Sequence, residues 1–233
     1  MNVKVLIGFL IGLVIITGVL IYFQFTKPVS YSESNTQCQK LIYNGDPSTK
    51  INVLFLAKNI NKVDIQSYVE SFLSFSPFAD YKDKFNFFYL DFIPSCEFYQ
   101  GVALYCYSND LIKKSSICPN DFIFVLSKET SNIRSSAYLN VISINTALPG
   151  SVLIHEFGHS FANLADEYIP AKIPYGSKNC QSNCDKFTGL GCFEGCSDAS
   201  HFRSSENSVM KTLRTSKYEQ FNENLVKQEL EKY

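Results

Sequence analysis

The segment of the chain best equipped for chemistry is His155-Glu156-Phe157-Gly158-His159, which holds two of the three histidines. Residues four apart share one face of a helix, so both imidazoles can bind one metal ion at about 2.0–2.1 Å. Glu156 follows the first histidine, where its carboxylate can reach a water on the metal. Zinc lowers the pKa of such a water to about 7. The spacing therefore predicts one catalytic Zn²⁺ held by His155 and His159, with Glu156 as the general base of a hydrolysis.

A third ligand is expected, because a catalytic zinc ion usually takes three protein ligands. A straight helix would carry Asp166 about 16 Å from His155, at about 1.5 Å per residue, so the chain must turn back first. Asn163 can make that turn, since asparagine tolerates left-handed backbone better than most residues. The extended zincin pattern HExxHxxGxxH has its third ligand three residues after the turn, which favours Asp166. Glu167 is the alternative ligand, and His201 is a weaker candidate.

These residues carry a resemblance to a known family. HEFGHSFANLADEY (155–168), together with RSSENSVM (203–210), resembles the IgA-peptidase family of zinc metallopeptidases. The resemblance implies a metzincin-like fold, zinc-dependent endopeptidase activity on a protein or peptide substrate, and the roles given above for the two histidines and Glu156. It also implies that Met210 lies in a methionine turn below the zinc; the alternative is a methionine that fills the core. Asn163 departs from the family's usual glycine. Immunoglobulin cleavage does not carry over, because pocket loops set the substrate.

The rest of the sequence predicts an α/β (α+β) domain with one mixed, twisted sheet. Apolar, β-branched runs predict strands at 51–57, 85–93, 122–126 and 138–144, and helical spacing predicts helices over 63–78 and 218–233. Ser151 is a candidate N-cap for the active-site helix, which is expected to start at Val152. In metzincin-like enzymes the strand before this helix is an edge strand that binds extended substrate, so 138–144 is expected to do so. Tyr168 and Tyr218 are candidate donors to an oxyanion; the alternative, in a chain with fourteen tyrosines, is that they serve in packing.

The chain has eight cysteines, an even number that suits disulfides in an oxidising compartment. Four of them, Cys180, Cys184, Cys192 and Cys196, have the spacing C-x3-C-x7-C-x3-C, which fits either disulfides or a structural zinc site. The other four, Cys38, Cys96, Cys106 and Cys118, are expected to pair among themselves. One further alternative is that Cys38 caps the zinc as a latency thiolate.

The first residues of the chain predict a membrane anchor. Residues 5–23 carry no charge, and about 20 apolar residues can span a bilayer as a helix. We expect a cytoplasmic tip and anchor over 1–27, a linker over 28–49, and a zinc metallopeptidase domain over 50–233 outside the cytoplasm. Cleavage of the N-terminal segment would instead make the protein secreted.

The formal net charge of −1 gives no reason to expect a nucleic-acid partner. The expected partners are therefore the peptide substrate and the lipid bilayer. A catalytically silent, zinc-containing cell-surface scaffold is the alternative to a membrane-anchored peptidase.

Overall fold

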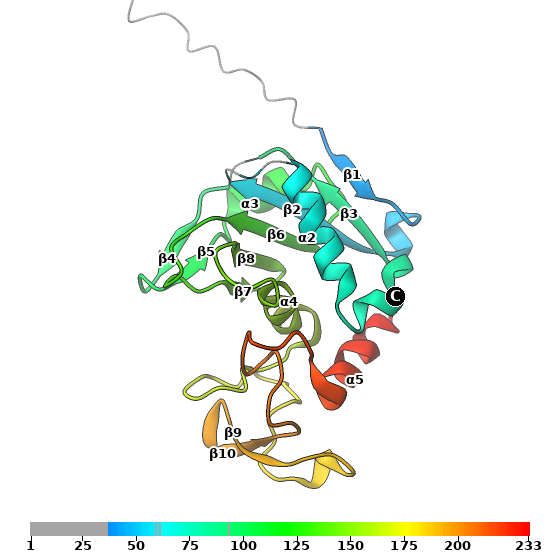
Figure 1. Cartoon of the computed structure of the whole chain (residues 1–233). Coiled ribbons are helices and arrows are strands. Elements are labelled where there is room, and N and C mark those ends of the chain that lie inside the picture. Colours follow the sequence, from blue (N-terminus) through cyan, green and yellow to red (C-terminus); the bar gives the residue numbers. More distant parts are fainter. Residues whose placement is uncertain (1–36, 59, 61, 93) are drawn as a thin grey trace, which may run out of the picture. The chain divides into compact units, whose positions relative to one another are not determined.

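The computed structural model describes residues 37–58, 60, 62–92 and 94–233, and a six-stranded sheet lies at the centre of this part of the chain. The four central strands are parallel, and the two edge strands are antiparallel to their neighbours (Figure 1). This confirms the prediction of a mixed α/β domain with one mixed sheet. From one edge to the other, the strands are β1 (Gln39–Ile42), β3 (Phe85–Tyr89), β2 (Ile51–Lys58), β6 (Phe122–Ser127), β8 (Val141–Asn145) and β7 (Ser136–Tyr138).

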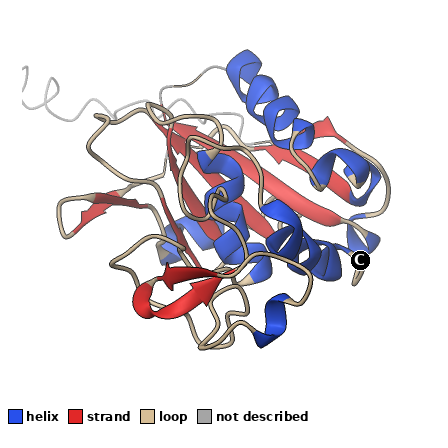
Figure 2. Cartoon of the chain, turned by 60° about the horizontal axis from the view of Figure 1, so that its bottom comes forward, coloured by secondary structure: helices blue, strands red, loops and turns tan. Residues whose placement is uncertain are grey.

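Helices cover both faces of this sheet, as a parallel sheet requires. On one face the apolar side chains of α2 (Lys62–Ser74), α4 (Val152–Ala162) and α5 (Glu219–Leu230) pack against the strands. On the other face lie α3 (Asn109–Ser115) and a hairpin of β4 (Glu97–Tyr99) and β5 (Ala103–Tyr105). Figure 2 shows the strands enclosed between these helices and loops. The sheet therefore has a core on each side.

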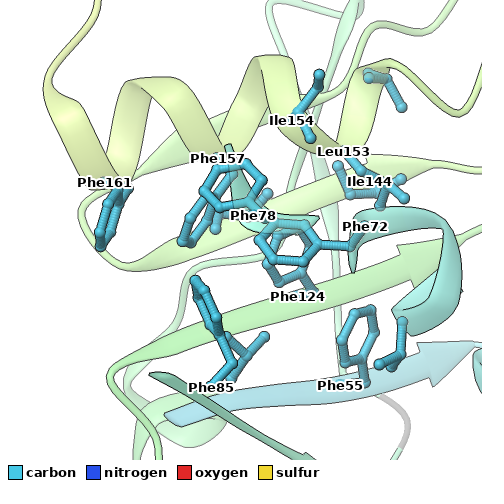
Figure 3. Close-up of a cluster of buried hydrophobic side chains, with 14 of the residues drawn as sticks. Phe55, Phe72, Phe78, Phe85, Phe124, Ile144, Leu153, Ile154, Phe157 and Phe161 are labelled. Atoms are coloured by element: carbon cyan, nitrogen blue, oxygen red, sulfur yellow. The ribbon is translucent and has the colours of Figure 1, made fainter. Parts of the chain in front are cut away.

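A cluster of phenylalanines fixes α4 to the sheet (Figure 3). The ring of Phe157 lies 5.1 Å from that of Phe72 of α2 and 5.8 Å from that of Phe124 of β6. Phe161 stacks one turn further along α4, 4.9 Å from Phe157. Full burial of each such side chain contributes about 1.5–3 kcal/mol. Because this face of α4 is buried against the sheet, the remaining face is left for polar side chains.

Two expected segments differ from the structure. The strand expected over 138–144 is a hairpin, because Leu139 adopts a left-handed backbone with φ of 52° and separates β7 from β8. Strand β8 pairs with β6 and β7 on its two sides, so it is not the edge strand that was expected; β7 is. Part of the range 28–49, expected to be linker, forms β1, which pairs with β3.

The cysteines form four disulfides within two groups, as expected. Cys38 pairs with Cys118 and Cys96 with Cys106, while Cys180 pairs with Cys196 and Cys184 with Cys192. The last two brace a loop that ends in the hairpin of β9 (Phe193–Cys196) and β10 (Asp198–Arg203). The alternatives of a structural zinc at the cysteine cluster and of Cys38 as a latency thiolate are therefore wrong.

The predicted anchor over residues 5–23 lies outside the described residues. Within the described ranges, no helix has the length and hydropathy needed to cross a membrane.

Candidate metal centre

Helix α4 presents His155, Glu156 and His159 on the face opposite its phenylalanines. One ligand atom from each of the three lies within 4.8 Å of the others. The helix begins at Val152, as predicted, but Ser151 does not cap it with its side chain. The Ser151 hydroxyl instead donates to the carbonyl of Leu213, which lies 62 residues later in the sequence. Among the described residues, this is the group of side chains suited to hold a metal ion.

Both imidazole rings are oriented by backbone carbonyls. The Nδ1 of His155 lies 2.8 Å from the carbonyl oxygen of Val209, and the Nδ1 of His159 lies 2.6 Å from that of Leu164. Because a carbonyl oxygen can only accept, each Nδ1 carries the proton that it donates. The Nε2 atom of each neutral ring is therefore left as a lone pair, the form that binds a metal.

The chain reverses direction directly after α4 and returns Asp166 to the histidines. Asn163 adopts left-handed backbone, with φ of 50° and ψ of 39°, and its N–H donates to the carbonyl of Gly158. The Oδ1 atom of Asp166 then lies 3.2 Å from Nε2 of His155 and 3.3 Å from Nε2 of His159. The turn expected at Asn163 is present, and of the two candidate carboxylates it brings Asp166 to the histidines.

The three atoms fit a tetrahedral metal site. The two Nε2 atoms lie 3.2 Å apart, so with Oδ1 of Asp166 they form a nearly equilateral triangle. Ligands at about 2.0–2.1 Å from a tetrahedral zinc ion lie about 3.3–3.4 Å from one another. Oδ1 of Asp166 is buried and faces the two Nε2 atoms, which carry no proton when the rings are neutral, so the three lone pairs converge without a donor. A cation satisfies them, as does a proton on one of the rings, which then donates to Asp166. The residues present therefore fit a metal ion.

The carboxylates and imidazoles of the site perturb one another strongly. Burial lowers the pKa of His159, but its bond to Asp166 and the charge on Glu156 outweigh burial and raise it to about 9. Burial also raises the pKa of Glu156, and the two histidines oppose this. The pKa of Asp166 falls well below its usual range despite its burial, because both imidazoles stabilise the carboxylate. A proton therefore competes with a metal ion for the point where these groups meet.

Glu167, the alternative ligand, points away from the site into a buried polar cluster. Its side chain accepts hydrogen bonds from Asn222 of α5 at 2.8 Å and from Asn179 at 3.2 Å, and a further one from the Ser208 hydroxyl. Its backbone N–H donates to the carbonyl of Met210 at 2.9 Å. Glu167 therefore ties the segment after α4 to α5 and to the turn around Met210.

Met210 lies against α4 at Gly158. A Cβ atom at Gly158 would lie 3.1 Å from Sδ of Met210 and 3.0 Å from Cε1 of Tyr218, so only glycine allows this approach. Met210 and Tyr218 are both fully buried. Because the hydroxyl of Tyr218 donates to the carbonyl of Ile154 in the core, Tyr218 is not an oxyanion donor.

A cleft of about 760 Å³ opens over the three α4 residues and Asp166. Tyr168 lines it, and burial together with the charge on Asp166 raises the pKa of Tyr168, so its hydroxyl stays protonated. His201 does not line the cleft; it lies on β10, where its Nδ1 is 2.9 Å from a carboxylate oxygen of Asp198.

Comparisons with protein-family models and with curated proteins gave no match. The assignment of a function therefore rests on the geometry of the site.

Sequence reasoning missed several residues of this site. The carbonyls of Val209 and Leu164 orient the imidazoles, and a backbone acceptor cannot be predicted from the pattern of side chains. Three cations that line the cleft, Arg134, Lys172 and Lys211, were also missed. Their only signal in the sequence is that each lies within a few residues of a site element or of an edge strand.

Proposed function

We propose that this protein is a zinc-dependent metallopeptidase that hydrolyses peptide bonds. The observation that carries the proposal is the convergence of three lone pairs, from His155, His159 and Asp166, beside the carboxylate of Glu156 in an open cleft. Two imidazoles and one carboxylate around an open position are typical of catalytic rather than structural zinc.

The proposed hydrolysis assigns a separate role to the metal, to Glu156 and to Tyr168. A bound zinc ion supplies Lewis acidity, which activates a water and polarises the scissile carbonyl. Glu156 is placed to take a proton from the attacking water and to pass it to the leaving amine. Tyr168 keeps its proton and lines the same cleft, but its hydroxyl is engaged with the carboxylate of Asp166; it would have to leave Asp166 to donate to the oxygen that becomes negative in the transition state.

The edge strand β7 is the natural place for an extended substrate. Ser136 and Ala137 of β7 line the cleft, and a peptide can add to a free sheet edge through backbone hydrogen bonds. Strand β5 lies against the start of this edge: the N–H of Leu104 donates to the carbonyl of Arg134, two residues before β7, at 2.8 Å, and the Ser136 hydroxyl donates to the carbonyl of Leu104. We place the substrate backbone along the part of β7 that follows Ser136.

Membership of the IgA-peptidase family, a metzincin-like fold and a membrane-anchored, extracytoplasmic location belong to the same proposal. The packing of Met210 under α4 at Gly158 supports a methionine turn below the metal. The four disulfides support an oxidising compartment, and residues 5–23 are long enough to serve as the anchor.

The proposal is tested by comparing the zinc-loaded protein with its Glu156→Gln variant in a digest of casein and of a peptide library. We expect cleavage that a chelator abolishes and added zinc restores. Loss of a general base lowers rates about 10²–10⁴-fold, so the variant should bind zinc and cleave at least about a hundredfold more slowly. Glu194→Gln, at an exposed glutamate on β9, is the matched control and should cleave normally. Zinc binding without any cleavage would favour the silent scaffold.

A further inference from the structure

The cleft carries a charge pattern that the metal centre does not explain. Among the described residues that line it, the carboxylates are Glu156 and Asp166, both at the candidate metal centre. Every other charged residue that lines it is a cation: Arg134, Lys172 and Lys211. With three cations and two carboxylates, the described lining has a formal charge of +1, whereas the whole chain has −1; away from the candidate metal centre, all the charged lining residues are cations. Clefts lined by one sign of charge concentrate ligands of the opposite sign.

Arg134 is exposed, yet its backbone is held firmly. Its N–H donates to the carbonyl of Val102 and its carbonyl accepts from the N–H of Leu104, both at 2.8 Å. The Cys96–Cys106 disulfide closes the hairpin that supplies these partners. The guanidinium makes no hydrogen bond or ion pair with any side chain in the described ranges, although it is near enough to Glu156 to lower the pKa of that carboxyl.

Lys172 reaches the cleft from a different segment. The N–H of Ala171, the residue before it, donates to the carbonyl of Ser197 at 2.8 Å, next to the Cys180–Cys196 disulfide. Its ammonium, like the guanidinium of Arg134, has no side-chain partner among the residues that the structure describes. Lys211 differs, because its ammonium already donates to the carbonyl of Glu206 at 2.8 Å.

We propose that Arg134 and Lys172 form a subsite for a carboxylate of the substrate, so that the enzyme selects acidic peptides. This inference rests on the proposed peptidase function and names its substrate class. A guanidinium binds a carboxylate with two parallel hydrogen bonds, and the lysine adds a second positive charge. Leu148, Val152 and Leu213 add apolar wall to the cleft, and its two carboxylates, Glu156 and Asp166, belong to the candidate metal centre. The carboxylate can come from an Asp or Glu side chain or from the C-terminus of a peptide.

The test is a binding measurement on the full-length, zinc-loaded Glu156→Gln protein. Three fluorescent peptides of one neutral sequence are compared by anisotropy: one with an internal Glu and an amidated end, one with Gln in its place, and one with Gln and a free C-terminal carboxylate. Each exposed ion pair contributes modestly, so the two together should make a carboxylate peptide bind about tenfold tighter than the neutral one, which corresponds to about 1.4 kcal/mol. The preference should shrink as salt is added.

The variants Arg134→Gln and Lys172→Gln, alone and together, should reduce this preference stepwise to about onefold. Lys113→Gln, at an exposed lysine on α3, is the matched control and should leave the preference unchanged. Preference for the internal Glu peptide identifies a side chain as the source, and preference for the free end identifies the C-terminus. Equal binding of all three peptides, no measurable binding, or a preference that survives the double variant would overturn the inference. If the carboxylate preference is found but the unmodified protein, which keeps Glu156, cleaves no peptide, the subsite is upheld and the peptidase function is refuted.

Discussion

Replacing Gly158 by alanine tests whether the packing of Met210 and Tyr218 against α4 supports the residues that would bind the metal. Gly158 lies between the two histidines on α4, where a new Cβ would approach Tyr218 and Met210 at 3.0–3.2 Å. Ordinary contacts of a Cβ lie at 3.4–4 Å, so each neighbour must move by a few tenths of an ångström. Neither moves freely, because both are fully buried and the hydroxyl of Tyr218 is bonded to Ile154.

Two opposing contributions set the size of the effect. Alanine is better than glycine in a helix interior by about 1 kcal/mol. Overpacking a dense core costs about 1–3 kcal/mol, and two immobile neighbours place Gly158 at the upper end of this range. The net expectation is a loss of about 2 kcal/mol in the free energy of unfolding. A shift of Met210 would also move the adjacent carbonyl of Val209, which orients His155, so zinc affinity should fall as well.

Urea unfolding followed by circular dichroism, with the disulfides intact, measures the loss of stability, and a competitive chelator titration measures zinc affinity. Gly150→Ala is the matched control, since a Cβ there would meet only the Ser71 hydroxyl at an ordinary 3.6 Å. We expect it to change stability by less than about 0.5 kcal/mol. The reasoning is refuted if Gly158→Ala unfolds at the same urea concentration as the unmodified protein, or if both variants lose equally.

Three further predictions concern the segment that carries the third ligand. Asp166→Asn should weaken zinc binding at least about a hundredfold with little loss of fold, whereas Glu167→Gln should keep zinc affinity; chelator titration of the two separates the ligand from its neighbour. Asn163→Ala should cost about 1–2 kcal/mol in urea unfolding because of its left-handed backbone, and Asn163→Gly clearly less. In the metal-free protein, the pKa of His159 rises from 6.5 to about 9, so its contribution to stability is complete below pH 6.5 and is lost as the pH rises through 9. Asp166 stays ionised throughout this window, and the unfolding midpoint in EDTA should therefore fall over it, but not in His159→Gln.

Helix α4 and the convergence of its histidines could be predicted from the sequence because their determinants are local. The spacing of His155 and His159, the left-handed preference of Asn163 and the apolar face of α4 all lie within a few turns of one helix. The choice between Asp166 and Glu167 was only a preference at that level. It depends on Asn179 and Asn222, which come from distant segments and draw Glu167 into the interior.

The failed predictions have physical causes that the local pattern does not show: a long-range contact, an unusual backbone conformation and a strand without alternation. Ser151 stands where an N-cap is expected, but its hydroxyl is bonded to Leu213, 62 residues away. The hairpin between β7 and β8 turns on Leu139 with positive φ, a conformation that leucine rarely adopts and that no turn signal announced. Strand β1 was hidden in a polar segment because it is a short edge strand, half exposed and without a clear alternation.

The third ligand and the oxidised loop share one support. The hydroxyl of Ser197 donates to the carbonyl of Asp166 at 2.6 Å, and Ser197 follows Cys196, which is bonded to Cys180. The carboxylate of the candidate metal centre is thus held by backbone that a disulfide closes. A newly made chain in a reducing compartment would have both histidines in place on α4 but a poorly held Asp166. We expect such a chain to acquire a metal only after oxidation, so the proposed peptidase activity would begin only in an oxidising compartment.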